Sequence, residues 1–508
     1  MILNCLLAMN YYCFQTKSGC YYAFDGRTGE IVQLSKQDFD NLQRGESALS
    51  GNSEFLMGLQ ASGILANLPL VKKGASKVLF QGKDYLLGDF ISQRRRQLVL
   101  EVTESCNLRC DYCVFGDHYD GFRKHSNKSL SEKMAFAAVE EFLESSTFPN
   151  AIMFYGGEPL LEFDLIRNVV FYAEKIATNK GKSLHFGVST NGTLLDNEKI
   201  LFFAEHNFSV QISIDGPREI HDLYRRYAKT QDSVFETIIG NIDGILAKEP
   251  DGKRPVFGCM ATMAPPMRWR ERNDFFASIY EKIPIRFCNF LRSNNHLCSS
   301  TFCSKSSSWH RIDRSDENEL WFMLDEFYKI FASDPILAQK NFPLIAIVVY
   351  NRLASIHYRN IRHPNNSLFF RYSCLPGYDK LFCNVDGLYY PCERTERKQC
   401  FCVGNASTGF DVEKTLNLLE RFQQLGACES CHICQFCEIC FSDIKTLDEI
   451  NWDDNSHSEF CKRLRECSKK NIAEYVSLME SNRSGLDILL DRDYDAERQL
   501  FYVAEQSW

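Results

Sequence analysis

The sequence predicts an α/β protein in three parts: a small N-terminal α+β unit, a core of parallel βα units and a cysteine-rich C-terminal region. Short apolar segments alternate with helical patterns between residues 97 and 291, which is typical of parallel βα units. A hairpin pattern precedes them, around Asp25-Gly-Arg-Thr-Gly29. Twelve of the 22 cysteines lie between Cys374 and Cys467. Clustered cysteines of this kind indicate metal or disulfide chemistry in the last part.

Composition excludes several classes of function. The chain has 508 residues and a net charge of −8, and it has no basic block, so we expect no nucleic-acid partner. No apolar run approaches the roughly 20 residues of a membrane span, so we expect no membrane anchor. The first residues lack the basic segment and cleavage site of a signal peptide. We therefore expect a cytoplasmic protein, in which clustered cysteines bind metal rather than form disulfides.

Residues 1–75 predict a small separate unit. Strands are expected at Tyr11–Thr16, Cys20–Phe24 and Ile31–Leu34, followed by helices at Lys36–Gln43 and Ser53–Ser62. Residues 76–96 are expected to be a linker.

Residues 97–291 predict the core. Its strands are expected at Gln97–Thr103, Ala151–Tyr155, Leu184–Ser189, Ser209–Ile214, Pro255–Thr262 and Ile285–Phe290. Its helices are expected at Ser131–Ser145, Leu160–Asn179, Asp196–His206, Ser233–Lys248 and Arg270–Lys282. Residues 292–370 predict bridging helices at Asp316–Asp334 and Leu337–His357, residues 371–467 the cysteine-rich domain, and residues 468–508 a helical segment.

The most informative motif directly follows the first core strand. Cys106, Cys110 and Cys113 form a C-x3-C-x2-C triplet, and Tyr112 precedes the third cysteine. Three thiolates from one loop can hold three irons of a [4Fe–4S] cluster and leave the fourth iron open. This triplet resembles the signature of the radical S-adenosylmethionine (SAM) superfamily. The alternative is a zinc knuckle with His118 or His125 as its fourth ligand.

The resemblance implies a fold and a reaction. The fold is an open, partial (β/α)6 TIM barrel, in which the chemistry occurs at the carboxyl ends of the strands. The reaction is reductive cleavage of SAM to a 5′-deoxyadenosyl radical, which abstracts a hydrogen atom from an unactivated carbon.

Motifs at later strand ends fit the same family. Gly156-Gly157-Glu158-Pro159 follows the second strand, and the resemblance implies that it holds the amino group of SAM. Ser189 and Asn191 follow the third strand, and the resemblance implies that they lie near the ribose; a helix N-cap with a turn is the alternative.

The fourth and sixth strands carry further candidate contacts. The resemblance to enzymes that mature sulfatases and ribosomal peptides implies that Ser213 and Arg225 contact SAM, Arg225 at the carboxylate. The neighbouring Arg226 is the alternative. Tyr112 and Gly157 would also contact SAM, and Leu291 would pack on the adenine.

The C-terminal cysteines resemble the SPASM domain, which binds two auxiliary [4Fe–4S] clusters. The resemblance assigns Cys374, Cys383, Cys392 and Cys440 to the first cluster, and Cys428, Cys431, Cys437 and Cys461 to the second. Cys434 allows a second register, Cys431-x2-Cys434-x5-Cys440, and zinc in one site is an alternative. Three clusters are then expected in all. Glu393, next to Cys392, is a candidate base, and a surface carboxylate beside a cluster loop is the alternative.

The three-part layout resembles peptide maturases, in which a winged-helix-like, PqqD-like domain binds the leader of a ribosomal precursor peptide by strand addition. An intramolecular crosslink is the expected product, with a thioether favoured over a carbon–carbon or carbon–oxygen bond. A flavodoxin- or ferredoxin-type protein would supply electrons. The first alternative is a maturase that oxidises Cys or Ser of a sulfatase to formylglycine. The second is a non-enzymatic protein that binds peptide or carries electrons.

Overall fold

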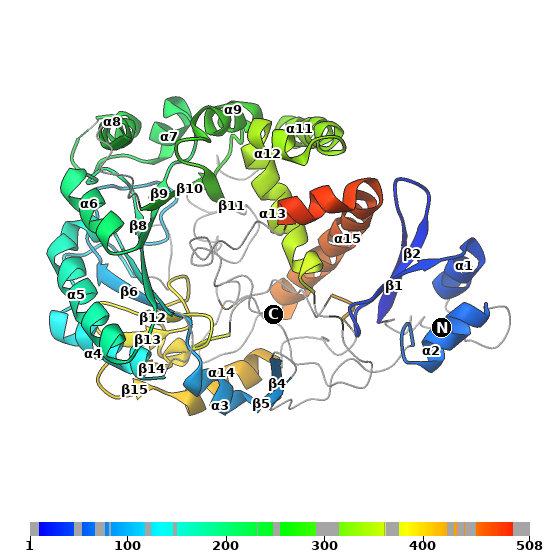
Figure 1. Cartoon of the computed structure of the whole chain (residues 1–508), viewed down its shortest axis with the longest axis horizontal. Helices are drawn as coiled ribbons and strands as arrows, with labels where there is room; N and C mark the ends of the chain where they lie inside the picture. Colours follow the sequence, from blue (N-terminus) through cyan, green and yellow to red (C-terminus); the bar gives the residue numbers. More distant parts are fainter. Residues whose placement is uncertain are drawn as a thin grey trace.

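The structure is a computed structural model. It describes residues 10–44, 53–66, 77–80, 83–116, 123–145, 150–230, 232–246, 255–290, 314–359, 361, 375–423, 431–433, 441 and 454–490. Figure 1 shows a large body that contains the main sheet, and a small N-terminal unit at its side.

The N-terminal unit is a three-stranded antiparallel sheet with two helices. The strands β1 (Tyr11–Gln15), β2 (Tyr21–Asp25) and β3 (Ile31–Leu34) pair in that order, and α1 (Lys36–Arg44) and α2 (Glu54–Ala61) follow. Asp25 closes the β2–β3 turn, because its side chain accepts hydrogen bonds from the backbone of Arg27, Thr28 and Leu65. The unit has a small apolar core of its own.

The segment expected to be a linker contains regular structure. Within residues 76–96, β4 (Lys77–Phe80) and β5 (Lys83–Leu86) form a hairpin, and α3 (Leu87–Gln93) follows. Leu87, Phe90 and Ile91 of α3 are buried in the main core. The short apolar face of α3 anchors this segment to the body of the protein.

The central sheet confirms the predicted α/β core. Its parallel strands are β6 (Gln97–Thr103), β7 (Asn150–Gly156), β8 (Leu184–Thr190), β9 (Phe208–Ser213), β10 (Val256–Met263) and β11 (Ile285–Phe290), in sequence order across the sheet. The connecting helices are α4 (Glu132–Ser145), η1 (Pro159–Glu162), α5 (Phe163–Asn179), α6 (Asn197–Glu205), α7 (Arg218–Tyr224), α8 (Val234–Leu246) and α9 (Trp269–Ile279). Every residue of β6 is buried, as expected for a strand that is covered on both faces.

The cysteine-rich region continues this sheet, which the sequence did not predict. The strands β12 (Leu381–Cys383), β13 (Leu388–Tyr390), β14 (Gly404–Asn405) and β15 (Gly409–Phe410) extend it to ten strands, and α14 (Val412–Gln423) follows. β12 lies parallel to β6 and pairs Phe382 with Val99. The parallel core and the C-terminal region therefore share one sheet.

Long helices close the remaining side. The expected helix Leu337–His357 is two helices, α12 (Pro335–Asn341) and α13 (Pro343–His357), because Pro343 starts a new helix at its first turn. They follow α11 (Arg314–Phe331), and α15 (Asp454–Leu490) packs against α13. None of the helices that the structure describes is both long and apolar enough to span a bilayer.

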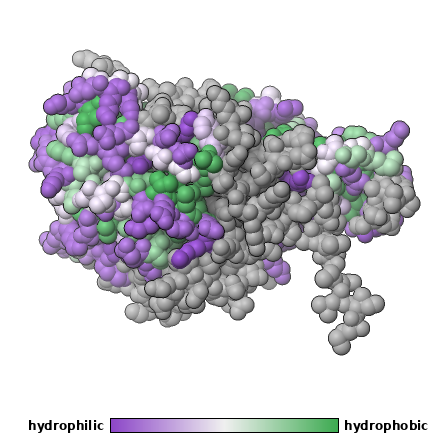
Figure 2. Space-filling model, turned by 90° about the horizontal axis from the view of Figure 1, so that it is seen from below, coloured by the Kyte–Doolittle hydropathy of each residue, from purple (hydrophilic) through white to green (hydrophobic). Residues whose placement is uncertain are grey.

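The N-terminal unit is docked on α15. Glu480 accepts hydrogen bonds from Thr16, Ser18 and Tyr22, at 2.9 to 3.2 Å. On the same side, a Cβ atom at Gly26 would lie 2.2 Å from the carbonyl oxygen of His432, so this contact requires glycine. Figure 2 shows the unit projecting from the body, whose described surface in this view is largely hydrophilic.

Candidate functional site

The cysteine triplet lies in the loop after β6 and is held by the segment after α7. Backbone N–H groups of Arg109 and Asp111 donate to the carbonyls of Arg226 and Tyr224, at 2.8 and 3.0 Å. Cys106, Cys110 and Cys113 therefore sit in a loop whose middle is tied to a neighbouring segment.

The three cysteines are half-buried, and their thiols lie near one another. Burial raises the pKa of Cys106 to about 12 and also raises the pKa values of Cys110 and Cys113. The charge of Cys113 raises the pKa values of Cys106 and Cys110 further, so a cationic centre bound among the three thiols would favour their thiolate forms. Among the residues that the structure describes, no three His, Cys, Asp or Glu side chains already have the geometry of a bound metal ion. The donor set nevertheless fits an iron–sulfur cluster in its chemistry.

Two glycines bring the end of β7 against this loop. Gly156 has a φ of 152°, and a Cβ atom there would lie 2.2 Å from the Thr103 carbonyl oxygen. A Cβ atom at Gly157 would lie 2.1 Å from the carbonyl oxygen of Ser105 and 3.0 Å from the Cβ of Cys106. Only glycine permits this approach between the β7 strand end and the cysteine loop.

Glu158 joins the ends of two strands. It is completely buried, and it accepts hydrogen bonds from the backbone N–H of Leu160, the hydroxyl of Thr190 and the backbone N–H of Asn191. Burial raises the pKa of Glu158, and the hydrogen bonds oppose this rise. The Asn191 amide in turn donates to Asn107 at 2.8 Å, beside Cys106. Glu158 therefore orients the end of β8 relative to the cysteine loop.

The end of β9 carries a buried ion pair. Asp215 follows Ser213 and accepts hydrogen bonds from Arg225 Nε at 2.9 Å and Arg225 Nη2 at 3.2 Å. It also accepts from the Tyr112 hydroxyl at 2.5 Å and the Thr262 backbone at 2.9 Å. Burial raises the pKa of Asp215, but the charges of Arg225 and His221 and the hydrogen bonds from Arg225 and Tyr112 together hold the pKa below its ordinary value.

Sequence reasoning missed two residues of this group. Asp215 is the carboxylate that fixes Arg225 and Tyr112, and its position directly after the strand in Ser213-Ile-Asp215-Gly-Pro was the available signal. Arg272 is completely buried and donates to the carbonyls of Asp215, Ala264 and Met267, which ties the β9 end to the β10 end. Nothing in the local sequence of α9 distinguishes Arg272 from a solvated helical arginine.

The remaining predicted SAM contacts are placed as follows. Ser189 is the penultimate residue of β8, and Ser213 ends β9. Arg226 donates to the Leu223 carbonyl and is less buried than Arg225. Leu291 lies outside the described residues.

The C-terminal cysteines are described only in part. Cys374, Cys428, Cys434, Cys437 and Cys440 lie outside the described residues. Cys431 and Cys461 lie close enough for the charge of Cys431 to raise the pKa of the Cys461 thiol, an effect smaller than that of burial. Cys383 is completely buried in β12, whereas Cys392 is half-buried in the loop after β13.

Glu393 is paired with a lysine. Both of its carboxylate oxygens lie 3.1 Å from Lys380 Nζ. Burial raises the pKa of Glu393, but the charges of Lys380 and Arg394 hold it below the ordinary value. The ion pair holds Glu393 in one position, and its role as a base stays a prediction.

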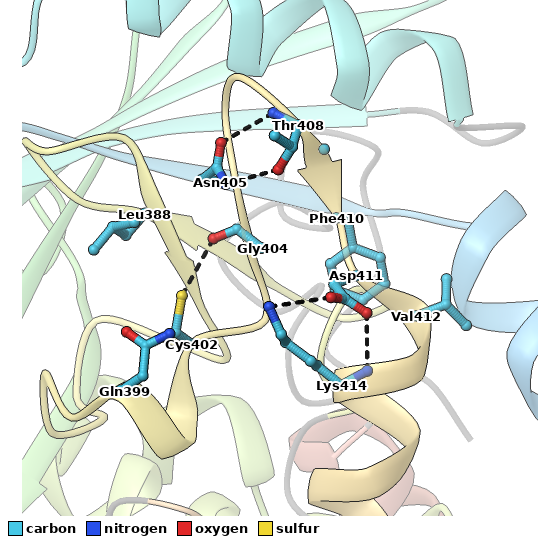
Figure 3. Close-up of a pocket in the computed structure, with 11 residues that line it drawn as sticks. Leu388, Gln399, Cys402, Gly404, Asn405, Thr408, Phe410, Asp411, Val412 and Lys414 are labelled. Carbon is cyan, nitrogen blue, oxygen red and sulfur yellow. Dashed lines mark hydrogen bonds and ion pairs between the residues drawn. The ribbon is translucent and has the colours of Figure 1, made fainter.

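A cavity of about 470 Å³ lies around β14 and β15, at the C-terminal edge of the ten-stranded sheet. Figure 3 shows Cys402, one of the cysteines without an assigned cluster, at its wall, where the thiol donates to the Gly404 carbonyl. Lys414 is paired with Asp411 in the same wall. None of the residues that line this cavity is a predicted cluster or SAM contact.

Comparison with known proteins identifies the region around the triplet. Residues 100–241 match the radical SAM superfamily. A serine-type anaerobic sulfatase-maturating enzyme of Bacteroides thetaiotaomicron is 31% identical over 28% of this chain and 34% of its own length. A cysteine-type anaerobic sulfatase-maturating enzyme of Clostridium novyi is 35% identical over 28% of this chain and 38% of its own length. The chain thus spans little more than a third of the length of these curated relatives.

Solved structures extend the likeness of the fold beyond the radical SAM region. Native anSMEcpe with bound AdoMet has a TM-score of 0.55 at 19% identity, over 74% of this chain and 99% of that chain. Native anSMEcpe with bound AdoMet and Cp18Cys peptide has a TM-score of 0.55 at 18% identity, over 75% of this chain and 99% of that chain. A likeness over about three quarters of this chain reaches well beyond residues 100–241.

Proposed function

We propose that this chain is a radical SAM peptide maturase that forms an intramolecular crosslink, most simply a thioether, in a ribosomally synthesised precursor peptide. The observation that carries the proposal is the convergence of the cysteine triplet, Gly157, Glu158 and the Asp215–Arg225 pair at the carboxyl edge of one parallel sheet. Parallel strands bring their carboxyl ends to the same edge, which is where ligands bind in α/β barrels.

Cys106, Cys110 and Cys113 would hold a [4Fe–4S] cluster. With SAM bound, this cluster supplies one-electron reductive cleavage to a 5′-deoxyadenosyl radical. The chain's own contribution is position, because the three half-buried cysteines come from one loop whose middle is tied to the segment after α7.

The residues at the other strand ends would hold SAM. Gly156 and Gly157 let the end of β7 approach the cysteine loop, beside which the methionine moiety of SAM would lie. Glu158 would accept a hydrogen bond from the ammonium group while it orients Asn191. The remaining contacts proposed for SAM are Tyr112, Ser189, Asn191, Ser213, Arg225 and Leu291.

Arg225 suits a carboxylate because its guanidinium is already oriented. Asp215 accepts hydrogen bonds from Nε and Nη2 of Arg225, which hold the arginine side chain in one orientation. The Nη1 group of Arg225 would then donate to the ligand.

The C-terminal cysteines would hold two auxiliary clusters beside the substrate. The pairing of β12 with β6 supports this placement, because it joins the C-terminal region directly to the strand that precedes the triplet. Known structures of the same fold include anSMEcpe with bound peptide. A thioether requires loss of one hydrogen from a thiol and one from a carbon, so the product is lighter by two hydrogens.

The N-terminal unit would bind the leader of the precursor. β3 is an edge strand of the small sheet, and an extended peptide can add to such an edge by backbone hydrogen bonds. A flavodoxin- or ferredoxin-type protein would supply the electrons.

The test is anaerobic reconstitution, with iron and sulfide counted and 5′-deoxyadenosine measured from SAM and dithionite. About twelve irons per chain with deoxyadenosine formation would support three clusters and radical chemistry. Co-incubation with the short Cys-containing peptide encoded nearest to this gene should then give a product lighter by two hydrogens. Deoxyadenosine formation with no loss of two hydrogens from that peptide would count against a crosslink.

The second candidate is formylglycine formation in a sulfatase, which the similarity to two sulfatase-maturating enzymes favours. Deletion of residues 1–75 distinguishes the two functions. A peptide maturase should lose turnover of its precursor but keep deoxyadenosine formation, whereas a sulfatase maturase should keep turnover of a Cys- or Ser-containing sulfatase peptide.

A further inference from the structure

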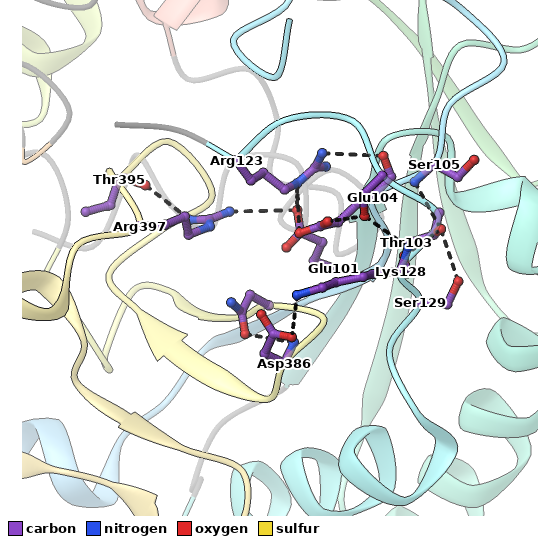
Figure 4. A network of polar contacts seen from close by, with 12 residues as sticks. Glu101, Thr103, Glu104, Ser105, Arg123, Lys128, Ser129, Asp386, Thr395 and Arg397 are labelled. Carbon is purple, nitrogen blue, oxygen red and sulfur yellow. Dashed lines mark hydrogen bonds and ion pairs between the residues drawn. The ribbon is translucent and has the colours of Figure 1, made fainter. Parts of the chain in front are cut away.

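A group of charged side chains lies between the radical SAM region and the C-terminal region. Glu101 comes from β6, Arg123 from the segment before α4, and Arg397 from the loop after β13 (Figure 4). Arg123 Nε lies 2.5 Å from Glu101 Oε1, whereas Arg397 Nη2 is 3.8 Å from the same oxygen. Glu101 is completely buried, and the side chains of Arg123 and Arg397 are 6% and 12% exposed.

Four buried polar atoms of this group have no hydrogen-bond partner among the residues that the structure describes. They are Glu101 Oε2, Arg123 Nη2, and both Nε and Nη2 of Arg397. A buried charged donor without a partner costs more than an ordinary hydrogen bond contributes, so such atoms are normally paired with a ligand or water. Three unpaired donors and one unpaired acceptor require a ligand that accepts more hydrogen bonds than it donates.

The arrangement of the donors indicates a carboxylate. Nε and Nη2 form one edge of the Arg397 guanidinium, and this edge matches the two oxygens of a carboxylate. The side chain is held by its Nη1, which donates to the Thr395 carbonyl at 3.1 Å, and by the rings of Phe382 and Tyr390 beneath the guanidinium. The unpaired edge is therefore fixed in place.

The charge balance around the group is compatible with a bound anion, because the nearby carboxylates have other partners. Glu104, 4.0 Å from Arg123 Nε, accepts from Ser126, and Glu393 is paired with Lys380. Arg394 adds a further positive charge nearby: burial and the Glu393 charge raise the pKa of Tyr155, whereas the charges of Arg394 and Arg123 lower it.

The group lies next to the cysteine loop. Side chains alternate along a strand, so Val99 and Glu101 share one face of β6, and Phe382 joins them because it pairs with Val99. Tyr155 of β7 pairs with Glu101 and lies 6.4 Å from Phe115, which is two residues beyond Cys113. Arg123 stacks on the same Phe115 ring at 3.7 Å. The unpaired donors thus lie beside the cysteine loop.

We propose that Arg397 and Arg123 bind a carboxylate of the peptide substrate, either an acidic side chain or the C-terminal carboxylate. This inference rests on the proposed function, because it takes the ligand to be a peptide. It assigns to this substrate an acidic group close to the residue that is modified, held at the junction of the two regions.

The experiment uses the full, reconstituted chain and three small probes. N-acetyl-glutamate N-methylamide presents a side-chain carboxylate, N-acetyl-alanine presents a terminal one, and N-acetyl-glutamine N-methylamide is the neutral control. Binding is measured by anaerobic calorimetry in the presence of SAM, for the natural chain and for Arg397→Gln, Arg397→Lys and Arg421→Gln. Arg421 is exposed on α14 and serves as the matched control.

At least one carboxylate should bind the natural chain and Arg421→Gln about tenfold more tightly than the neutral amide. Arg397→Gln should abolish this preference and Arg397→Lys should restore only part of it, because lysine keeps the charge but lacks the paired edge. The carboxylate that binds more tightly identifies the source.

Equal binding of the carboxylates and the amide would overturn the proposal. So would a preference that survives in Arg397→Gln, since Arg397 would then only pair with Glu101. A loss of SAM affinity in Arg397→Gln to the same extent would assign the arginine to SAM instead. Deoxyadenosine formation without a carboxylate preference rejects this inference alone, whereas a carboxylate preference without deoxyadenosine rejects only the proposed radical chemistry.

Discussion

At the scale of single residues, the candidate site depends on buried carboxylates that the chain uses to orient other groups. Asp215 accepts hydrogen bonds from Arg225 and Tyr112, and Glu158 accepts one from the backbone N–H of Asn191 at the end of β8. A buried ion pair contributes little net stability, but removal of one partner leaves the other charge uncompensated. The main role of Asp215 is therefore to fix the position of Arg225.

We predict that Asp215→Asn weakens SAM binding and lowers the free energy of unfolding by about 3 kcal/mol, because it leaves the buried Arg225 without a countercharge. Calorimetric titration with SAM and denaturant unfolding measure the two effects. The control is Asp232→Asn, because Asp232 is exposed. An unchanged SAM affinity in Asp215→Asn would show that Arg225 does not depend on this pair.

His185 makes a second prediction at this scale, on pH. Burial lowers the pKa of His185 to about 4, from 6.5, while its ring contacts the Ser209 hydroxyl at 2.9 Å. The unfolded chain then binds a proton that the folded chain does not, so the stability of the fold falls as the pH falls from 6.5 toward 4. We expect a smaller fall over this range in His185→Asn, measured by thermal unfolding. Parallel curves for the two proteins would contradict the prediction.

At the scale of secondary-structure elements, the decisive contact is between the end of β7 and the cysteine loop. The loop passes so close to Gly156 and Gly157 that backbone atoms occupy the places of their Cβ atoms. The sequence identified the glycines, but the contact itself depends on the parallel pairing of β6 with β7.

We predict that Gly157→Ala separates the loop from the strand, because its Cβ would meet the Ser105 carbonyl. The variant should unfold at lower temperature and retain less iron after reconstitution, since the proposed iron ligand Cys106 lies in this loop. Gly240→Ala is the matched control, because a Cβ atom there meets no atom within 4 Å. Gly240 lies in α8, so alanine should leave stability unchanged or raise it by up to about 1 kcal/mol. Equal iron content in the two variants would contradict the prediction.

At the scale of the whole molecule, three parts of the chain are joined by contacts between residues far apart in sequence. The strand β12 extends the barrel sheet beside β6, and the N-terminal unit rests on α15 through Glu480 and against His432. His432 follows Cys431, so the N-terminal unit touches a loop that we propose to hold an auxiliary cluster.

We predict that Glu480→Ala loosens the N-terminal unit without unfolding the barrel, because three hydrogen bonds of about 1 kcal/mol each are lost at one surface. Hydrogen exchange should increase in residues 10–44 and remain unchanged in β6–β9. Glu420→Ala, at an exposed position of α14, is the control. Unchanged exchange in residues 10–44 would mean that other contacts suffice to hold the unit.

Much of the core was predictable because its signals are local. The strands at Gln97–Thr103 and Ile285–Phe290 occur where apolar runs predicted them, and others differ by a residue or two at their ends. The short helix α7 was missed, since seven residues give too little periodicity. The helix break at Pro343 was also missed, although proline is a local signal.

The sequence by itself determined which groups this protein has for its site. These are the thiols of the triplet, the glycines that allow close approach, and the strand–helix alternation that brings strand ends together. Residue type and short spacing carry these properties. Only the tertiary structure decided that Asp215 pairs with Arg225, that Glu393 pairs with Lys380, and that Glu101, Arg123 and Arg397 meet with unpaired donors. Those contacts depend on strand order and register, which join residues up to hundreds of positions apart and leave no trace in local sequence.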